Sequence, residues 1–316
     1  MQRIIISLTL LLPVAAPAAP RTVELTLHAM KASEPSKQYT LLPKADEQKD
    51  ADAAPLYDKA LQSLPSELQM NEVNQWLKTP PDKLPPKQVQ STLRQLKPTL
   101  ELLAQAAGCK QCDWPYLDDD ALSENLRKHR RLIFLLALKV RYQIAQSQYD
   151  DATRTMRMGF VMARHLGEDP TLLRGLVGIS IAAYMCRQLE AFIQRPDAPD
   201  LYHALRDLPQ PCIDLTKQSE WEDKDIRGKV HSLMNRLDRH VAVLQCIEAM
   251  RLYAASHEGK FPKQLSDMTR IRVPTDPVTG KPFIYSRTGA EAVLEIPATG
   301  EETDRDTMRY ELNLKE

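Results

Sequence analysis

The fold is decided by a stretch near the C-terminal end. It reads Arg251-Leu-Tyr-Ala-Ala-Ser-His-Glu-Gly-Lys-Phe-Pro-Lys-Gln-Leu265, followed by Val273-Pro-Thr-Asp-Pro-Val-Thr-Gly-Lys-Pro-Phe-Ile-Tyr285. Gly259 can end a helix because glycine adopts the left-handed conformation without strain. The proline-rich loop that follows opens into short alternating segments, a pattern typical of strands. The stretch therefore predicts a long helix that ends at Gly259 and a small sheet behind it.

The helix is expected over 218–257, where apolar residues recur at helical spacing, and 231–316 is expected to form one helix-plus-sheet unit. Residues 282–285 and 292–296 flank Arg-Thr-Gly-Ala, a hairpin turn, and 308–314 alternates as a third strand. We expect four apolar residues to pack on the helix: Phe283, Tyr285, Leu294 and Ile296. Ile284 and Val293 would face away from it, because side chains alternate along a strand. These six residues form the candidate interaction surface.

This C-terminal segment resembles the globular end of the major pseudopilins of type II secretion. The matching residues are Gly259, Phe261, Pro262, Leu265, Pro274, Asp276, Pro277, Gly280, Pro282 and Tyr285. The chain lacks the Gly-Phe-Thr-Leu-Ile-Glu start of pseudopilins, so the resemblance implies the local fold alone. Pseudopilins bind calcium in the tail loop, which corresponds here to 301–306. Arg305 intrudes there, and we expect a solvated loop, with a calcium site as the alternative.

The preceding region, 51–195, is expected to be a domain of several helices. Apolar residues recur at helical spacing over about 53–64, 67–78, 86–107, 119–147, 150–166 and 170–194. The turn Ala145-Gln-Ser-Gln-Tyr-Asp-Asp-Ala152 resembles the corner of a tetratricopeptide-like helical hairpin, without a sustained 34-residue period. The predicted fold is thus mainly α: a multi-helix domain, then a long helix and a small C-terminal antiparallel sheet, an α+β arrangement similar to pseudopilins.

The N-terminal end has the composition of an export signal. Residues 1–18 carry Arg3, an apolar run from Ile4 to Leu12 and Ala16-Pro-Ala18 as a cleavage region, so the mature chain would begin near Ala19. The apolar run is too short to span a bilayer, and the mature chain is expected to have no transmembrane span. Residues 19–50 are polar and predict a flexible leader. Residues 196–230 predict a proline-rich connector and the start of the long helix.

Charge and cysteine content restrict the possible functions. Lys plus Arg and Asp plus Glu are equal at 42 each, so no net field attracts nucleic acid. Cys109-Lys-Gln-Cys112 is the strongest chemical motif. Asp113 replaces the histidine of a haem site, no second pair lies near for zinc, and no thioredoxin-like unit precedes it. We expect a local structural disulfide, with redox and metal roles as alternatives.

No catalytic or metal site is predicted. The seven histidines form no His-Glu-x-x-His motif, and the common nucleotide-binding and nucleophile motifs are missing from the sequence. The chain from Ala53-Ala-Pro-Leu-Tyr57 through Cys109-x-x-Cys112-Asp-Trp114 to the tail resembles a family of uncharacterised exported bacterial proteins. That resemblance implies export and a helical build.

The main hypothesis is a non-catalytic scaffold without cofactor that binds another exported or envelope protein. Its expected place is the periplasm, the cell envelope or the extracellular space. The alternative is an exported hydrolase or thiol oxidoreductase whose site is assembled only by the fold.

Overall fold

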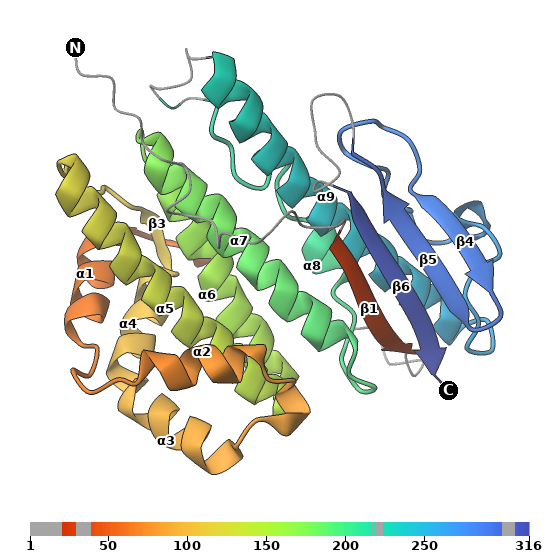
Figure 1. The fold of residues 1–316 in the computed structure, drawn as a ribbon, viewed down its shortest axis with the longest axis horizontal. Coiled ribbons are helices and arrows are strands. Elements are labelled where there is room, and N and C mark those ends of the chain that lie inside the picture. Colours follow the sequence, from red (N-terminus) through yellow and green to blue (C-terminus); the bar gives the residue numbers. More distant parts are fainter. Residues whose placement is uncertain (1–20, 30–38, 217, 219–223, 299–306, 316) are drawn as a thin grey trace.

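The structure is a computed structural model that describes residues 21–29, 39–216, 218, 224–298 and 307–315 (Figure 1). The expected signal peptide at 1–18 and the acidic tail loop at 301–306 lie outside the described residues. The described chain is mainly helical with a small mixed sheet, which confirms the predicted fold class.

The first part of the helical region consists of four short helices. These are α1 (Ala54–Gln62), α2 (Met70–Lys78), α3 (Pro86–Gln95) and α4 (Lys97–Ala106), with the 3-10 turns η2 (Ala45–Glu47) and η3 (Pro81–Lys83). Three of the helices, α1, α3 and α4, have a proline in the first turn. One helix was expected over 86–107, but the chain breaks at Leu96. Pro98 lies in the first turn of α4, where proline needs no amide hydrogen bond, and it prevents α3 from continuing.

Three long helices form the centre of the core: α5 (Asp119–Ala145), α6 (Tyr149–Gly167) and α7 (Leu172–Ile193). A three-residue turn joins α5 to α6, with Ser147 in the left-handed region at a φ of 55°. The helices α6 and α7 approach closely at Gly178, where a β-carbon would come within 2.5 Å of the Ala163 carbonyl oxygen. A side chain at position 178 would therefore force the two helices apart.

By length and composition alone, α7 could cross a membrane; its mean hydropathy is 1.3. Two thirds of that segment is buried inside the fold. Core helices of globular domains have the same composition, so this property does not decide between the two environments.

The connector contains α8 (Tyr202–Arg206) and leads into α9 (Lys224–Ala255), which runs without a break through Gly228. The apolar face of α9 is buried as expected, at Leu237, Val241, Leu244, Ile247 and Met250. This face lies between α7 and the sheet (Figure 1).

The sheet has four strands in the order β1-β6-β5-β4. They are β1 (Arg21–His28), β4 (Ile284–Thr288), β5 (Glu291–Ile296) and β6 (Met308–Lys315). The pairs β4–β5 and β5–β6 are antiparallel, whereas β1 runs parallel to β6, with Leu25 opposite Leu312. A separate short pair joins β2 (Lys49–Asp52) to β3 (Cys109–Gln111).

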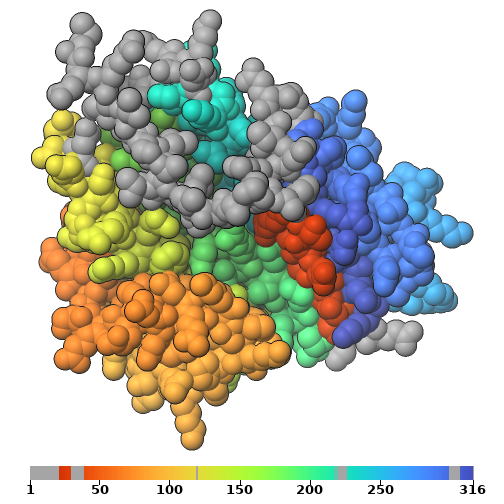
Figure 2. All heavy atoms as spheres, in the orientation of Figure 1, coloured from red at the N-terminus to blue at the C-terminus, as the bar shows by residue number. Residues whose placement is uncertain are grey.

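The expectation of a flexible leader over 19–50 is wrong for β1 and β2, and the sheet is mixed rather than antiparallel. Val23, Leu25 and Leu27 alternate with polar residues, so one face of β1 is apolar while its mean composition stays polar. Leu25 and Leu27 are fully buried. Figure 2 shows β1 at the surface, filling the space between α7 and β6.

The segment after α9 is held against the sheet by side chains of the edge strand. The helix α9 ends at Ala255, four residues before the expected end at Gly259. Gly259 lies in the turn that follows, with a φ of 65°, and Phe261 is 1% exposed. The Tyr285 hydroxyl donates to the Pro262 carbonyl at 2.7 Å, and Arg287 donates to the Phe261 carbonyl. The Gly-x-Phe-Pro pattern therefore forms the turn after α9, and this turn lies beside β4.

We predict that β1 is an integral part of the core. Replacing Leu27 by Ala should lower the free energy of unfolding by about 2–5 kcal/mol, because the residue is fully buried and its loss leaves a cavity. Urea denaturation measures this change. Thr22→Ala, an exposed position on the same strand, is the control and should stay close to the wild type; equal midpoints for Leu27→Ala would show that β1 is not docked.

Candidate functional site

The two cysteines of the Cys-x-x-Cys motif lie at the start and just beyond the end of β3. Cys109 is buried, Cys112 is half-buried, and both are free thiols. Extended chain places residues three apart at roughly 10 Å between α-carbons, beyond the ~7 Å that a disulfide can span. The structure therefore does not form the expected local disulfide, because β3 pairs with β2.

Neither thiol is poised for redox chemistry. Burial, followed by the charge of Asp52, raises the pKa of both the Cys109 and the Cys112 thiol. A reactive dithiol needs the opposite environment, one that stabilises a thiolate. The geometry favours a structural role for this motif.

Aromatic and imidazole rings surround the motif and form what we call the ring cluster: Tyr57, Trp114, His129 and His165. The Tyr57 and Trp114 rings stack at 5.3 Å between centroids, and His129 meets Trp114 edge-on at 5.0 Å. The Trp114 indole nitrogen donates to the His165 carbonyl at 2.7 Å. These contacts connect α1, the loop after β3, α5 and α6.

Both histidines of the ring cluster are neutral at physiological pH. Burial lowers the pKa of His129 and lowers that of His165 to about 4. The Tyr57 hydroxyl lies 2.9 Å from His165 Nδ1 and can donate to a neutral ring. Within the described residues, no group of three His, Cys, Asp or Glu side chains could hold a metal ion.

The six residues of the candidate interaction surface divide between the core and the outer face. Phe283, Leu294 and Ile296 are at most 5% exposed, and Tyr285 is half-buried. Ile284 is 54% exposed, and Val293 is half-buried.

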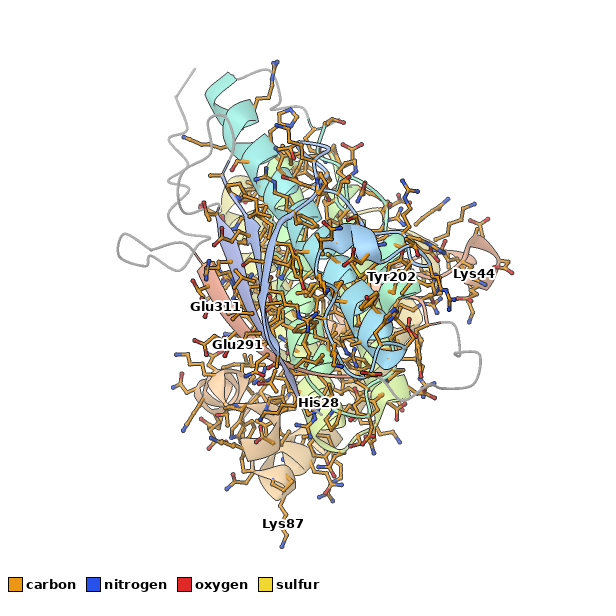
Figure 3. The ribbon with its side chains drawn as sticks, turned by 90° about the vertical axis from the view of Figure 1, so that its right-hand side faces the viewer. His28, Lys44, Lys87, Tyr202, Glu291 and Glu311 are labelled. Carbon is orange, nitrogen blue, oxygen red and sulfur yellow. The ribbon has the colours of Figure 1, made fainter. Side chains whose placement is uncertain are left out.

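The face of the sheet that carries Ile284 and Val293 is mainly charged. Glu291 and Glu311 belong to it (Figure 3), and Arg309 forms ion pairs with Glu295 and Glu311. The apolar part of this face is therefore small.

A buried carboxylate connects the sheet to the helices. Glu190, near the end of α7, accepts two hydrogen bonds from Arg21 of β1, at 2.6 and 2.8 Å. His240 of α9 lies 2.8 Å from the same carboxylate, and the Tyr310 hydroxyl of β6 donates to it at 2.9 Å. We call these four residues the Glu190 joint.

Within the joint, the negative charge of Glu190 lies at low solvent exposure and is balanced by the positive charge of Arg21. Burial raises the pKa of Glu190, but the hydrogen bond from His240 and the charge of Arg21 more than offset it, and the pKa is about 2. Burial lowers the pKa of His240, so a neutral imidazole donates its Nε2 hydrogen to the carboxylate. Glu190 is the only acidic residue in α7, and a single acid in an apolar helix is the signal that sequence reasoning overlooked.

Two other buried ion pairs fix the loops that flank α9. Arg239 binds both carboxylate oxygens of Asp276 at 3.0 Å each, which ties the Pro-Thr-Asp-Pro loop to the helix. Arg251 pairs with Glu248 at 2.9 Å and donates to the Ala198 carbonyl of the connector. These side chains are committed to the fold.

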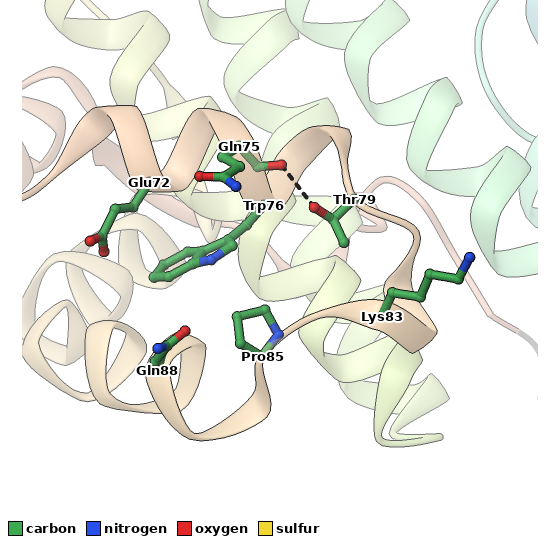
Figure 4. Close-up of a pocket in the computed structure, with 7 residues that line it drawn as sticks. All are labelled: Glu72, Gln75, Trp76, Thr79, Lys83, Pro85 and Gln88. Atoms are coloured by element: carbon green, nitrogen blue, oxygen red, sulfur yellow. Dashed lines mark hydrogen bonds between the residues drawn. The ribbon is translucent and has the colours of Figure 1, made fainter.

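Two surface cavities lie on the helical region, away from the Glu190 joint. The first, about 410 Å³, has a Trp76 and Pro85 wall with polar side chains around it (Figure 4). Its Thr79 hydroxyl is already bonded to the Gln75 carbonyl at 3.0 Å. Trp76 is only 7% exposed, so its ring offers little free surface to a ligand.

The second cavity, about 420 Å³, is formed by α3, α4, α5, the turn before α6 and the middle of α6, and we call it the α3–α6 groove. Its walls carry Gln90, Leu93, Arg94, Lys97, Leu100, Glu101, Ala104, Lys139, Tyr142, Gln143, Gln148 and Met158. The apolar members form a floor, and three cations stand against a single acid. Sequence reasoning missed this site because four separate helices contribute to it.

The central cation of the groove is Lys139. It is half-buried in α5, and burial lowers its pKa. Asp151 and Glu101 attract Lys139 at longer range, but Asp151 forms its ion pair with Arg154, and Glu101 forms its ion pair with Lys97 at 3.8 Å. Within the part of the chain that the structure describes, neither Lys139 nor Arg94 forms an ion pair or hydrogen bond with another residue.

We predict that Glu190 contributes to stability through its charge. Its folded pKa of about 2 lies below the ordinary 4.5, so this contribution is complete above pH 4.5 and is lost as the pH falls toward 2. The difference in free energy of unfolding between the wild type and Glu190→Gln should shrink over that window.

Chemical denaturation at pH 7, 4 and 2.5 measures the Glu190 effect. Glu24→Gln, at an exposed position of β1, is the control and should follow the wild type throughout. A constant difference between the wild type and Glu190→Gln across this range would contradict the assignment.

We also predict that Cys109 and Cys112 remain thiols that react slowly. Since their pKa values are raised, alkylation by iodoacetamide at pH 8 should be at least about tenfold slower than for glutathione, which has more thiolate. Unfolding in urea should remove the difference. Peptide mapping without reductant is the second measurement, and a peptide closed by a Cys109–Cys112 disulfide would disprove this prediction.

Comparison of the chain with protein-family models, curated proteins and solved structures gave no match.

Proposed function

We propose that this protein is a non-catalytic binding module of the bacterial periplasm or cell envelope, and that its helical body binds a segment of another protein. The α3–α6 groove carries the proposal: it combines apolar side chains with Lys139 and Arg94, which form no hydrogen bond or ion pair within the described chain. Cavities of several hundred Å³ with a few convergent polar groups are the usual form of ligand sites.

The partners of the buried carboxylates outside the groove favour a binding function over a catalytic one. Glu190 and Asp276 are each paired with an arginine from another part of the fold. Glu248 pairs with Arg251 within α9, and Arg251 also donates to the Ala198 carbonyl of the connector. The raised pKa values of the two motif thiols oppose a thiol oxidoreductase. A scaffold requires this kind of rigid body more than a set of reactive side chains.

The shape of α3 is suited to a groove wall. Val89 is its one buried residue within the helix bounds, and prolines at 85, 86 and 98 border it. A helix with so little buried surface can adjust its position by small amounts. Met158, on the opposite wall, has a flexible side chain that fits different apolar groups.

We predict that a protein partner contacts the groove directly. A photo-crosslinking residue placed at Gln148, on the groove rim, should give a discrete adduct in cells, whereas the same residue at Lys128, on α5 outside the groove, should not. Mass spectrometry identifies the captured protein, which is then purified for a binding measurement.

The binding measurement separates a specific contact from chance capture. Ala104 is exposed on the groove wall, so Ala104→Trp fills the cavity without disturbing the core. It should weaken the partner's affinity at least about tenfold, since it blocks the contact. Gln105→Trp, the neighbouring exposed position outside the groove, is the matched control; equal affinities for both variants would end this proposal.

A further inference from the structure

We propose that the α3–α6 groove recognises an acidic peptide segment: an aspartate or glutamate side chain bound at Lys139 and Arg94, beside an apolar side chain on the groove floor. This inference rests on the proposed binding function and adds the chemistry of the partner.

The electrostatics of the groove point to a carboxylate. Arg94, Lys97 and Lys139 contribute three positive charges to the lining, against one negative charge from Glu101. Glu101 lies 3.8 Å from Lys97 at the exposed rim. Lys139 and Arg94 therefore have full capacity for a charge-assisted hydrogen bond, which is stronger than a neutral one.

The position of Lys139 makes this charge selective. An exposed lysine gains little from an anion, because water screens the pair. Lys139 is half-buried between α4 and α5, so an incoming carboxylate meets it where water is partly excluded. The same burial disfavours a cationic segment, since like charges would be brought together at low solvent exposure.

The floor and the rim favour a peptide over a small anion. Leu93 and Met158, both half-buried, present apolar surface that a lone phosphate would not use. Gln90 and Gln148 stand exposed on the rim, where a primary amide can both donate to and accept from a peptide backbone. The occupant thus needs an apolar group, a carboxylate and backbone amides within a short span.

Peptide display on the whole protein tests the chemistry without a known partner. A nine-residue random library is selected on the wild type after removal of peptides that bind Ala104→Trp, whose groove is filled. We expect enrichment of Asp or Glu within two positions of Leu, Ile, Met or Phe. Enrichment of a motif without an acidic residue would refute the inference and leave the proposed function standing; the absence of any groove-dependent enrichment would refute it as well.

The contribution of the cation is then measured with the most enriched peptide, labelled with fluorescein. Fluorescence anisotropy should show about tenfold weaker binding to Lys139→Met, because one charge-assisted hydrogen bond is lost. Replacing the peptide's acid by its amide should weaken binding to the wild type equally and have little further effect on the variant. Lys128→Met, on the same helix outside the groove, is the matched control.

Two further measurements cover the remaining outcomes. Arg94→Gln, at an exposed position, repeats the measurement if Lys139→Met does not give the circular dichroism spectrum of the wild type. Sodium dodecanoate and inorganic phosphate are added as competitors, each at about 1 mM. Small ligands that bind specifically occupy their sites at this concentration. Displacement by dodecanoate would assign the groove to lipid carboxylates, displacement by phosphate would assign it to oxyanions, and either result would overturn the peptide assignment.

Discussion

The arrangement of helices and sheet depends on one buried carboxylate. Glu190 lies on the apolar helix α7, where an unpaired charge would be very costly. Its partners come from β1, β6 and α9, so the charge is compensated only when all four elements are in place. A slip of one residue in β1 would turn Arg21 to the solvent together with its apolar neighbours. The joint therefore specifies the register of β1 in addition to its contribution to stability.

The helix α9 carries two further buried ion pairs along its length. Arg239 anchors the Asp276 loop on one side, and Arg251, twelve residues later, holds the connector through Glu248 and the Ala198 carbonyl. Removing one partner of such a pair is costly because it leaves the other buried and uncompensated. The proline-rich loop that contains Asp276 is therefore held in position by this residue, and the residues on either side of it form the turn.

The parts of the fold that were predicted have local causes. The helices follow from apolar spacing, proline positions and Gly259, all of which can be read within a few residues. The strand β1 was missed, although Val23, Leu25 and Leu27 alternate, because its polar composition and its place after an expected signal suggested disorder. Its pairing partner is near the other end of the chain, which no local pattern shows. The groove was invisible for a related reason: Lys139 and Leu93 meet only after α3 and α5 have packed.

The parallel pairing of β1 with β6 delays completion of the sheet until the end of the chain has been synthesised. From His28 to Met308 is an interval of 280 residues, 308 − 28, and ribosomes add roughly 5–20 residues per second. For a period of about 15–60 s the backbone hydrogen-bonding edge of β1 that pairs with β6 is without its partner strand. Such a strand can pair with other chains while it waits. The cell must shield this segment with a chaperone or keep the nascent chains apart until β6 has been made.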